Sequence, residues 1–126
     1  MLQPVVAAVI ERDRRVLICQ RPQGKRHGGL WEFPGGKVHA DESIPEAVSR
    51  ELAEELAVQT TEVGEVLFSR VDQRSGFEIL FLHATVEGEP VALEHSEIVW
   101  CEPAQLLSYP LAPSDHAFAS FYLRTA

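Results

Sequence analysis

Short apolar runs separated by polar turns dominate the chain and predict a set of strands. Residues 4–10 and 15–20 are rich in Val and Ile, and the charged segment Arg12-Asp13-Arg14 joins them, so we predict a hairpin. A polar loop at 22–29 leads to a short extended piece at 30–33. Later apolar runs bounded by Gly-containing turns predict three further strands, at 62–70, 77–86 and 97–101.

The strongest helical pattern covers residues 44–56, where Val48, Leu52 and Leu56 recur at every fourth position. Asp41 or Ser43 can cap its start, and Pro45 suits a first turn. A short helical turn is expected at 103–107 and a final helix at 114–123. Mixed strands with helices on both sides predict an α+β fold, an α/β/α sandwich with a mixed β-sheet between helices.

Length and composition narrow the class of protein. The 126 residues suffice for a single domain, 1–126, and the net charge of −8 argues against a protein that holds nucleic acid through its phosphates. Cys19 and Cys101 lie in apolar surroundings without metal-ligand spacing, as expected for buried thiols in a reducing compartment. No apolar run approaches membrane-spanning length and the start lacks a basic leader, so we expect a cytoplasmic protein.

Three carboxylates gather on one face of the predicted helix. Glu51, Glu54 and Glu55 stand at positions i, i+3 and i+4, which places them within one turn. Such a group is repulsive unless a cation lies between its members, and Mg²⁺ prefers oxygen ligands of this kind. A solvated acidic helix face is the plain alternative, because many surface helices carry such residues.

The residues around these carboxylates favour the metal site. Five residues separate Gly36 from Glu42, seven more precede Arg50-Glu51-Leu52-Ala53-Glu54-Glu55, and the apolar Val58 follows. This segment resembles the Nudix box at every defining position except Ala57, where the family has Gly. That Gly adopts a left-handed conformation just past the helix, so Ala57 is expected to cost on the order of 1 kcal/mol or to shift the helix end.

The resemblance implies a role for each matching residue. Glu51, Glu54 and Glu55 would bind Mg²⁺, with Mn²⁺ as a substitute, and Glu51 or a neighbour would orient the attacking water. Arg50 would hold the carboxylate face and Glu42 through charge-assisted bonds. Gly35 and Gly36 would let the backbone approach metal and phosphate closely. Lys37 could reach the phosphates, or could equally be a solvated loop lysine.

Beyond the box, the chain resembles MutT-type Nudix enzymes, which clear nucleoside triphosphates, and most of all the bacterial CTP pyrophosphohydrolase branch. The resemblance rests on Gln20-Arg21-Pro22, on residues 30–37, on residues 94–100 and on residues 109–115. It implies that Arg21 contributes to substrate binding and that Glu94 is a catalytic carboxylate, as metal ligand or base, on a mobile loop. Without the resemblance, Glu94 would be interpreted as one surface glutamate among many.

Two residues outside the box are candidates for reading the base. An ionised Asp115 only accepts hydrogen bonds, which suits the exocyclic amine of cytosine, whereas a protonated one could also donate. A simple helix N-cap is the alternative for Asp115. Phe33 could lie against a base face, although a Phe in a strand more often packs in the core.

These observations predict an enzyme that acts on a small nucleotide. The expected reaction converts a nucleoside triphosphate to a monophosphate and pyrophosphate, with CTP, dCTP or an oxidised nucleotide such as 8-oxo-dGTP as substrate. The alternatives are a Nudix hydrolase of a nucleotide sugar or a dinucleotide polyphosphate, and a binding module without turnover. We expect no stable nucleic-acid partner, no membrane, and a monomer or weak homodimer.

Overall fold

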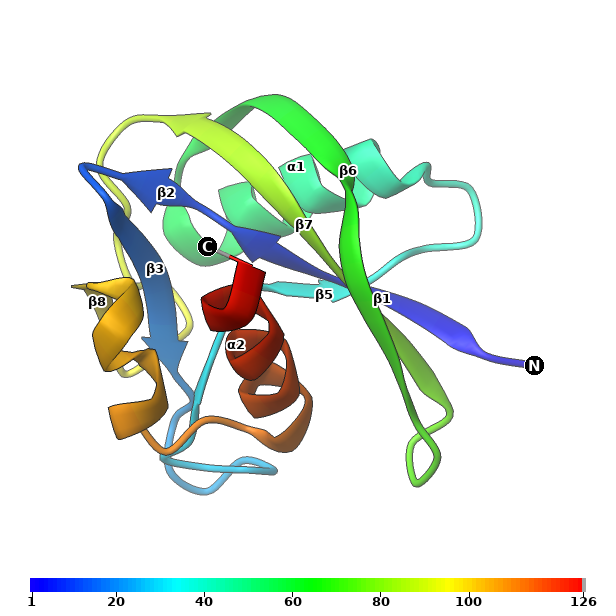
Figure 1. Cartoon of the computed structure of the whole chain (residues 1–126). Coiled ribbons are helices and arrows are strands. Elements are labelled where there is room, and N and C mark those ends of the chain that lie inside the picture. Colours follow the sequence, from blue (N-terminus) through cyan, green and yellow to red (C-terminus); the bar gives the residue numbers. More distant parts are fainter. Residues whose placement is uncertain (126) are drawn as a thin grey trace.

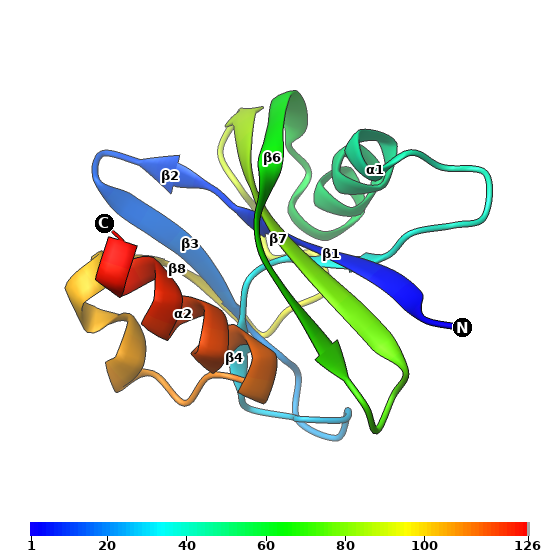
Figure 2. The same ribbon diagram turned by 45° about the vertical axis from the view of Figure 1, so that its right-hand side comes forward.

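The computed structural model describes residues 1–125, so Ala126, the last residue of the predicted domain, lies outside the described residues. Strands lie between two helices, α1 on one side and α2 on the other (Figures 1 and 2). The elements in chain order are β1 (Gln3–Val9), β2 (Glu11–Arg12), β3 (Arg15–Gln20), β4 (Trp31–Glu32), β5 (Gly35–Lys37), α1 (Ile44–Leu56), β6 (Gln59–Asp72), β7 (Phe77–Glu87), β8 (Glu97–Cys101), the 3₁₀ helix η1 (Pro103–Ser108) and α2 (Pro113–Thr125).

The strands form two sheets. The first has the order β5-β1-β7-β6 and is mixed, because β1 and β7 run parallel while the other pairs are antiparallel. In the second, β3 pairs with β2, β4 and β8, all antiparallel. The predicted α+β fold with a mixed sheet between helices is therefore confirmed, although the strands divide into two sheets and not one.

Two apolar clusters fill the spaces between the layers, and strand alternation decides which residue enters which cluster. On β1, Val6 and Ala8 face the cluster around α1, while Ala7 and Val9 face the cluster around α2. β3 alternates in the same way. Because both faces of these strands are covered, their sequences read as continuous apolar runs.

Helix α1 forms where its pattern predicted. The apolar stripe Val48, Leu52 and Leu56 is fully buried. Of the two candidate caps, Ser43 is the one used: its hydroxyl accepts from the Glu46 N–H, and the Glu46 carboxylate accepts from the Ser43 N–H. This capping box satisfies two backbone donors that the first turn leaves free.

The C-terminus of α1 resolves the question that Ala57 raised. Ala57 adopts the left-handed conformation, with φ 58° and ψ 36°, and its N–H donates to the Ala53 carbonyl. The helix therefore ends as it would with Gly, and the chain retains the strain of a Cβ in that conformation.

Three expectations need correction. The predicted hairpin of 4–10 with 15–20 holds only near its turn, because β1 joins the first sheet and only β2 pairs with β3. Residues 35–37, where we predicted no strand, form β5 beside β1. β6 begins at Gln59, where the sequence predicted a start at 62. Among the described residues no helix has the length and apolarity that a bilayer crossing requires.

Candidate active site

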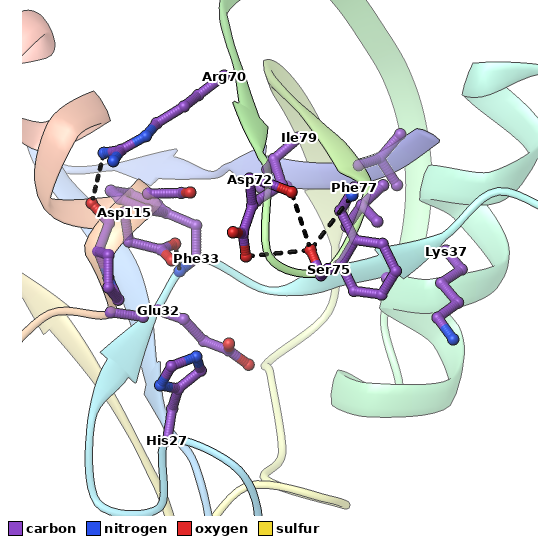
Figure 3. Close-up of a pocket in the computed structure, with 18 of the residues that line it drawn as sticks. His27, Glu32, Phe33, Lys37, Arg70, Asp72, Ser75, Phe77, Ile79 and Asp115 are labelled. Carbon is purple, nitrogen blue, oxygen red and sulfur yellow. Dashed lines mark hydrogen bonds between the residues drawn. The ribbon is translucent and has the colours of Figure 1, made fainter. Parts of the chain in front are cut away.

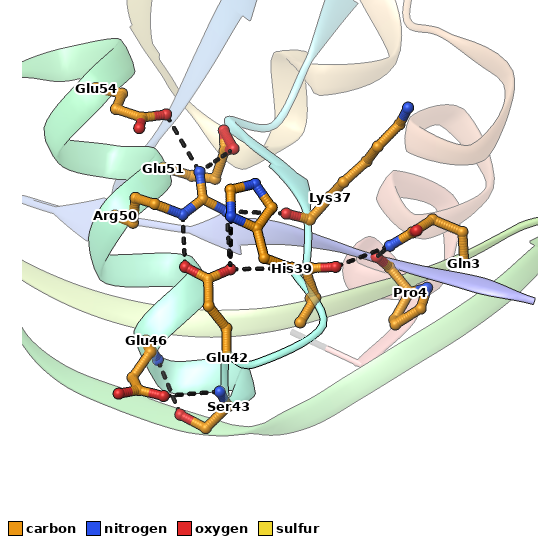
Figure 4. A network of polar contacts seen from close by, with 11 residues as sticks. Gln3, Pro4, Lys37, His39, Glu42, Ser43, Glu46, Arg50, Glu51 and Glu54 are labelled. Atoms are coloured by element: carbon orange, nitrogen blue, oxygen red, sulfur yellow. Dashed lines mark hydrogen bonds and ion pairs between the residues drawn. The ribbon is translucent and has the colours of Figure 1, made fainter.

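Arg50 organises the carboxylates at the start of the site (Figure 4). Its guanidinium donates two hydrogen bonds to Glu42, and its Nη1 donates to Glu51 at 2.8 Å and to Glu54 at 3.2 Å. Nη2 also donates to the Lys37 carbonyl at 2.9 Å, which ties α1 to β5. Arg50 lowers the pKa of Glu42 to about 2, so this carboxylate remains ionised and the network stays paired. The predicted contacts of Arg50 are confirmed.

Glu55 lies on the buried side of the carboxylate group. It is only 6% exposed and accepts a 3.3 Å hydrogen bond from the Gly35 N–H. Burial and the contact with Glu51 raise the pKa of Glu55 well above its usual range, with smaller contributions from Glu32 and Glu94. Carboxyl groups are thus concentrated here, and with no cation among its described contacts Glu55 keeps its proton near neutral pH.

Both glycines before α1 are required by close approaches. A Cβ on Gly35 would lie 1.9 Å from the Val6 carbonyl oxygen of the neighbouring strand. A Cβ on Gly36 would lie 2.5 Å from the Glu51 carboxyl group. The backbone of β5 therefore lies within contact distance of the carboxylate oxygens on α1.

The donor set fits a hard divalent cation. Glu51 places carboxylate oxygens against Gly36 and Glu55 places one against Gly35, and Mg²⁺ and Mn²⁺ are bound by such oxygens. Glu54, half exposed, is turned toward Arg50 and not toward Glu55. Over residues 1–125 no three acidic, His or Cys side chains already converge in a metal-binding arrangement. Glu54 would therefore have to rotate on its flexible side chain to join the other two.

A cavity of about 710 Å³ lies next to β5 (Figure 3). Its wall includes Gly35, Gly36 and Lys37 at one end and Asp115 at the start of α2. Arg70, on β6, also lines it and donates to the Pro113 carbonyl at 3.1 Å. A space of this size is ordinary for small-molecule sites. The cavity thus joins the predicted phosphate end to the predicted base reader.

Asp115 is buried, and its Oδ1 accepts a 2.9 Å hydrogen bond from the Phe33 N–H. Burial, followed by the nearby Glu32, raises the pKa of Asp115 to about 8. The Asp115 side chain thus bonds to Phe33, 82 residues away between β4 and β5, and not to the first turn of α2 as a simple N-cap would. Near neutral pH the side chain is protonated, so it can both donate and accept.

The other three predicted substrate-binding residues differ in how their side chains lie relative to the cavity. Phe33 is 3% exposed and packs edge-to-face against Phe81 and Phe118, so its ring belongs mainly to the core although the residue borders the cavity. Lys37 is exposed on β5, with its Nζ 5.3 Å from the centre of the Phe77 ring. Arg21 lines the cavity and donates to Glu32 at 3.0 Å.

Three residues that the sequence did not single out also belong to this region: Glu32, Arg70 and His95. Glu32 accepts from Arg21 and contacts His95 at 2.9 Å. Glu94 lies in the loop before β8 and close enough to Glu55 to raise its pKa. A charged Glu32 between the buried Trp31 and Phe33 was the available signal, since such positions are rarely charged without a partner.

Carboxylates beside glycine backbone, next to a cavity of small-molecule size, are typical of hydrolases that act on phosphate compounds with the help of a bound metal. The sequence model of the NUDIX domain matches residues 1–122, so the chain belongs to the Nudix family and is a Nudix hydrolase. Enzymes of this family generally need a divalent metal.

Curated relatives agree with this assignment. CTP pyrophosphohydrolase of Escherichia coli is 50% identical over 115 residues, covering 88% of this chain and 84% of the relative. An 8-oxo-dGTP diphosphatase of Haemophilus influenzae is 32% identical over 116 residues, covering 87% and 84%.

Solved structures share the fold over almost the whole chain. The solution structure of the E. coli ORF135 protein has a TM-score of 0.83 and 44% identity, covering 98% of this chain and 89% of that one. A MutT structure from work on the Aliivibrio salmonicida and Vibrio cholerae proteins has a TM-score of 0.86 and 27% identity, with full coverage of both chains.

Proposed function

We propose that this chain hydrolyses nucleoside triphosphates to a monophosphate and pyrophosphate, with Mg²⁺ as its cofactor and with CTP, dCTP or a modified nucleotide such as 8-oxo-dGTP as substrate. One observation carries the proposal: a single cavity runs from Gly36, against which the Glu51 carboxyl group lies, to Asp115. The 50% identical CTP pyrophosphohydrolase of E. coli supports CTP, and the 8-oxo-dGTP diphosphatase of H. influenzae supports an oxidised nucleotide.

At the phosphate end, the chain supplies fixed carboxylates and a guanidinium that holds them. Glu51, Glu54 and Glu55 would bind the metal, with the backbone of Gly35 and Gly36 beside them. When bound, Mg²⁺ offsets phosphate charge and lowers the pKa of its water. Arg50 keeps Glu51 oriented by donating to it while pairing with Glu42, so the carboxylate that orients the water starts in place.

At the base end, Asp115 offers one donor and one acceptor in its protonated form. Cytosine presents an amine donor next to a ring-nitrogen acceptor, and this edge can pair with both groups of a carboxylic acid. Phe33 fixes the Asp115 orientation through its N–H, and Arg70 lines the same wall. These contacts support a substrate whose base, pyrimidine or purine, carries a hydrogen-bond donor next to an acceptor on one edge.

The direct test is a substrate panel with Mg²⁺: CTP, dCTP, 5-methyl-dCTP, 8-oxo-dGTP, ADP-ribose and diadenosine polyphosphate, with products identified by chromatography. We expect a monophosphate and pyrophosphate, and the highest kcat/KM, from one of the triphosphates. Preference for ADP-ribose or the dinucleotide would replace the substrate class, and no turnover of any compound would refute both enzyme hypotheses.

Glu54→Gln tests the metal ligands. An amide cannot neutralise metal charge, so we expect kcat to fall by about 100-fold or more while the far-ultraviolet circular dichroism spectrum stays unchanged. Glu65→Gln is the matched control, because Glu65 is an exposed carboxylate on β6 and does not belong to the Glu51, Glu54 and Glu55 group. Near-full Mg²⁺-dependent activity in Glu54→Gln would show that the ligand assignment is wrong.

A further inference from the structure

The loop between β7 and β8, residues 88–96, is fixed to the metal-binding helix by its backbone. The Val91 N–H donates to the Leu56 carbonyl at 2.9 Å, and the Leu93 N–H donates to the Glu55 carbonyl at 3.0 Å. The last carbonyls of a helix have no partner within it, so the loop satisfies two of them. The loop therefore follows the end of α1 as far as Leu93.

On the far side of Glu94 the loop is fixed again. The Nε2 atom of His95 lies 2.9 Å from the Glu32 carboxylate on β4, and the Ser96 N–H donates to the Gln20 carbonyl at 3.0 Å. Glu94 has a backbone bond to α1 before it and a side-chain bond to β4 after it. Because the neighbouring Leu93 N–H donates to the Glu55 carbonyl, Glu94 is held next to the end of α1.

The His95 side chain is suited to this contact and poorly suited to simple packing. It is only 6% exposed, and within residues 1–125 its Nδ1 atom has no hydrogen-bond partner. A buried polar atom without a partner is unfavourable, and an apolar side chain of similar size would fill the same space without that cost. What histidine adds is the Nε2 donor to Glu32, because a carboxylate paired with a guanidinium accepts hydrogen bonds.

Glu32 makes this contact part of the active site. One of its oxygens accepts from Arg21, the other contacts His95, and the residue lines the cavity. A single carboxylate thus joins the loop that follows β3 to the loop that carries Glu94.

We infer that His95 is a positioning residue: through Glu32 it fixes the 88–96 loop, and with it Glu94, next to the C-terminal end of α1. The inference rests on the proposed function for its kinetic consequence, but the geometry of the loop can be tested without turnover.

The test varies His95 and leaves Glu32 intact, because Glu32 also borders the substrate. His95→Leu keeps the volume and removes the donor, His95→Gln restores an N–H donor, and His116→Leu, at an exposed position of α2, is the control. With Mg²⁺ and CTP we expect His95→Leu to lower kcat by about 10- to 100-fold at nearly unchanged KM, as for other groups that orient catalytic residues. His95→Gln should recover most of that loss.

A double-mutant cycle separates positioning from general damage. In a Glu94→Gln background, His95→Leu should change kcat by no more than about twofold, because the group it positions is already lost. Equal losses from His95→Leu in both backgrounds, or full activity of His95→Leu alone, would overturn the inference.

Amide hydrogen exchange tests the loop without metal or substrate. His95→Leu should speed exchange at residues 91–96 while the core amides of α1 keep wild-type protection. Unchanged exchange in the loop would contradict the inference. If the wild-type protein turned over no triphosphate, the proposed function would fail, and the exchange data would still decide whether His95 holds the loop.

Discussion

Replacing Asp115 by Asn should remove a specific pH dependence of stability. Burial raises the pKa of Asp115 from 3.8 to about 8, so between these values the folded protein keeps a proton that the unfolded chain releases. The stabilisation from this group is complete below the unfolded pKa and is lost as the pH rises through the folded pKa. One bound proton corresponds to about 1.4 kcal/mol per pH unit, so a window of about four units amounts to on the order of 5 kcal/mol.

Urea unfolding followed by circular dichroism, from about pH 5 to about pH 9, measures this effect. Asn can still accept from the Phe33 N–H but does not ionise, so Asp115→Asn should gain stability relative to wild type as the pH rises and level off above the folded pKa. Asp41→Asn, in the exposed turn before α1, is the control. Parallel curves for Asp115→Asn and wild type would refute the assigned protonation.

Four further substitutions test the backbone and the ion pairs around the site. Ala57→Gly should raise the free energy of unfolding by about 1 kcal/mol, because φ is 58° at this exposed position; no gain in thermal unfolding would contradict the strain. Gly36→Ala should lower kcat by about 10-fold or more with little loss of stability, because the Glu51 carboxyl group that the new Cβ displaces is at the end of a flexible side chain. In Gly35→Ala the new Cβ meets backbone atoms, so we expect a loss of about 3 kcal/mol or more in the free energy of unfolding. Similar losses of stability in the two variants, measured by calorimetry, would contradict this difference. Arg50→Lys should lower kcat by about 10- to 100-fold, because one ammonium cannot bond Glu42 and Glu51 together as the guanidinium does; wild-type kinetics would exclude this role.

Local patterns were sufficient to predict α1 and its carboxylates. The i, i+4 stripe and the cap at Ser43 depend on neighbours within one turn, so helix geometry is enough to predict them without knowing the sheets. The contact of Arg50 with Glu42, which lies before the helix, was instead implied by the resemblance to the Nudix box.

The sequence did not predict which strands pair with each other across long stretches of chain. The chain crosses between sheets near Ile10, and nothing in the alternating apolar pattern distinguishes a strand that pairs with its neighbour from one that leaves it. The contact between Glu32 and His95 spans 63 residues and depends on that crossing. The burial of Phe33 likewise depends on a long-range contact, because the Phe118 ring against which it packs lies on α2.

The identity of the products from CTP tests the central claim most directly. Wild-type protein is incubated with CTP, with Mg²⁺ or with a chelator, and the reaction is followed by phosphorus NMR. The account predicts CMP and pyrophosphate in equal amounts, no reaction with the chelator, and recovery when excess Mg²⁺ is added. Release of CDP and phosphate, or turnover that persists with the chelator, would contradict it.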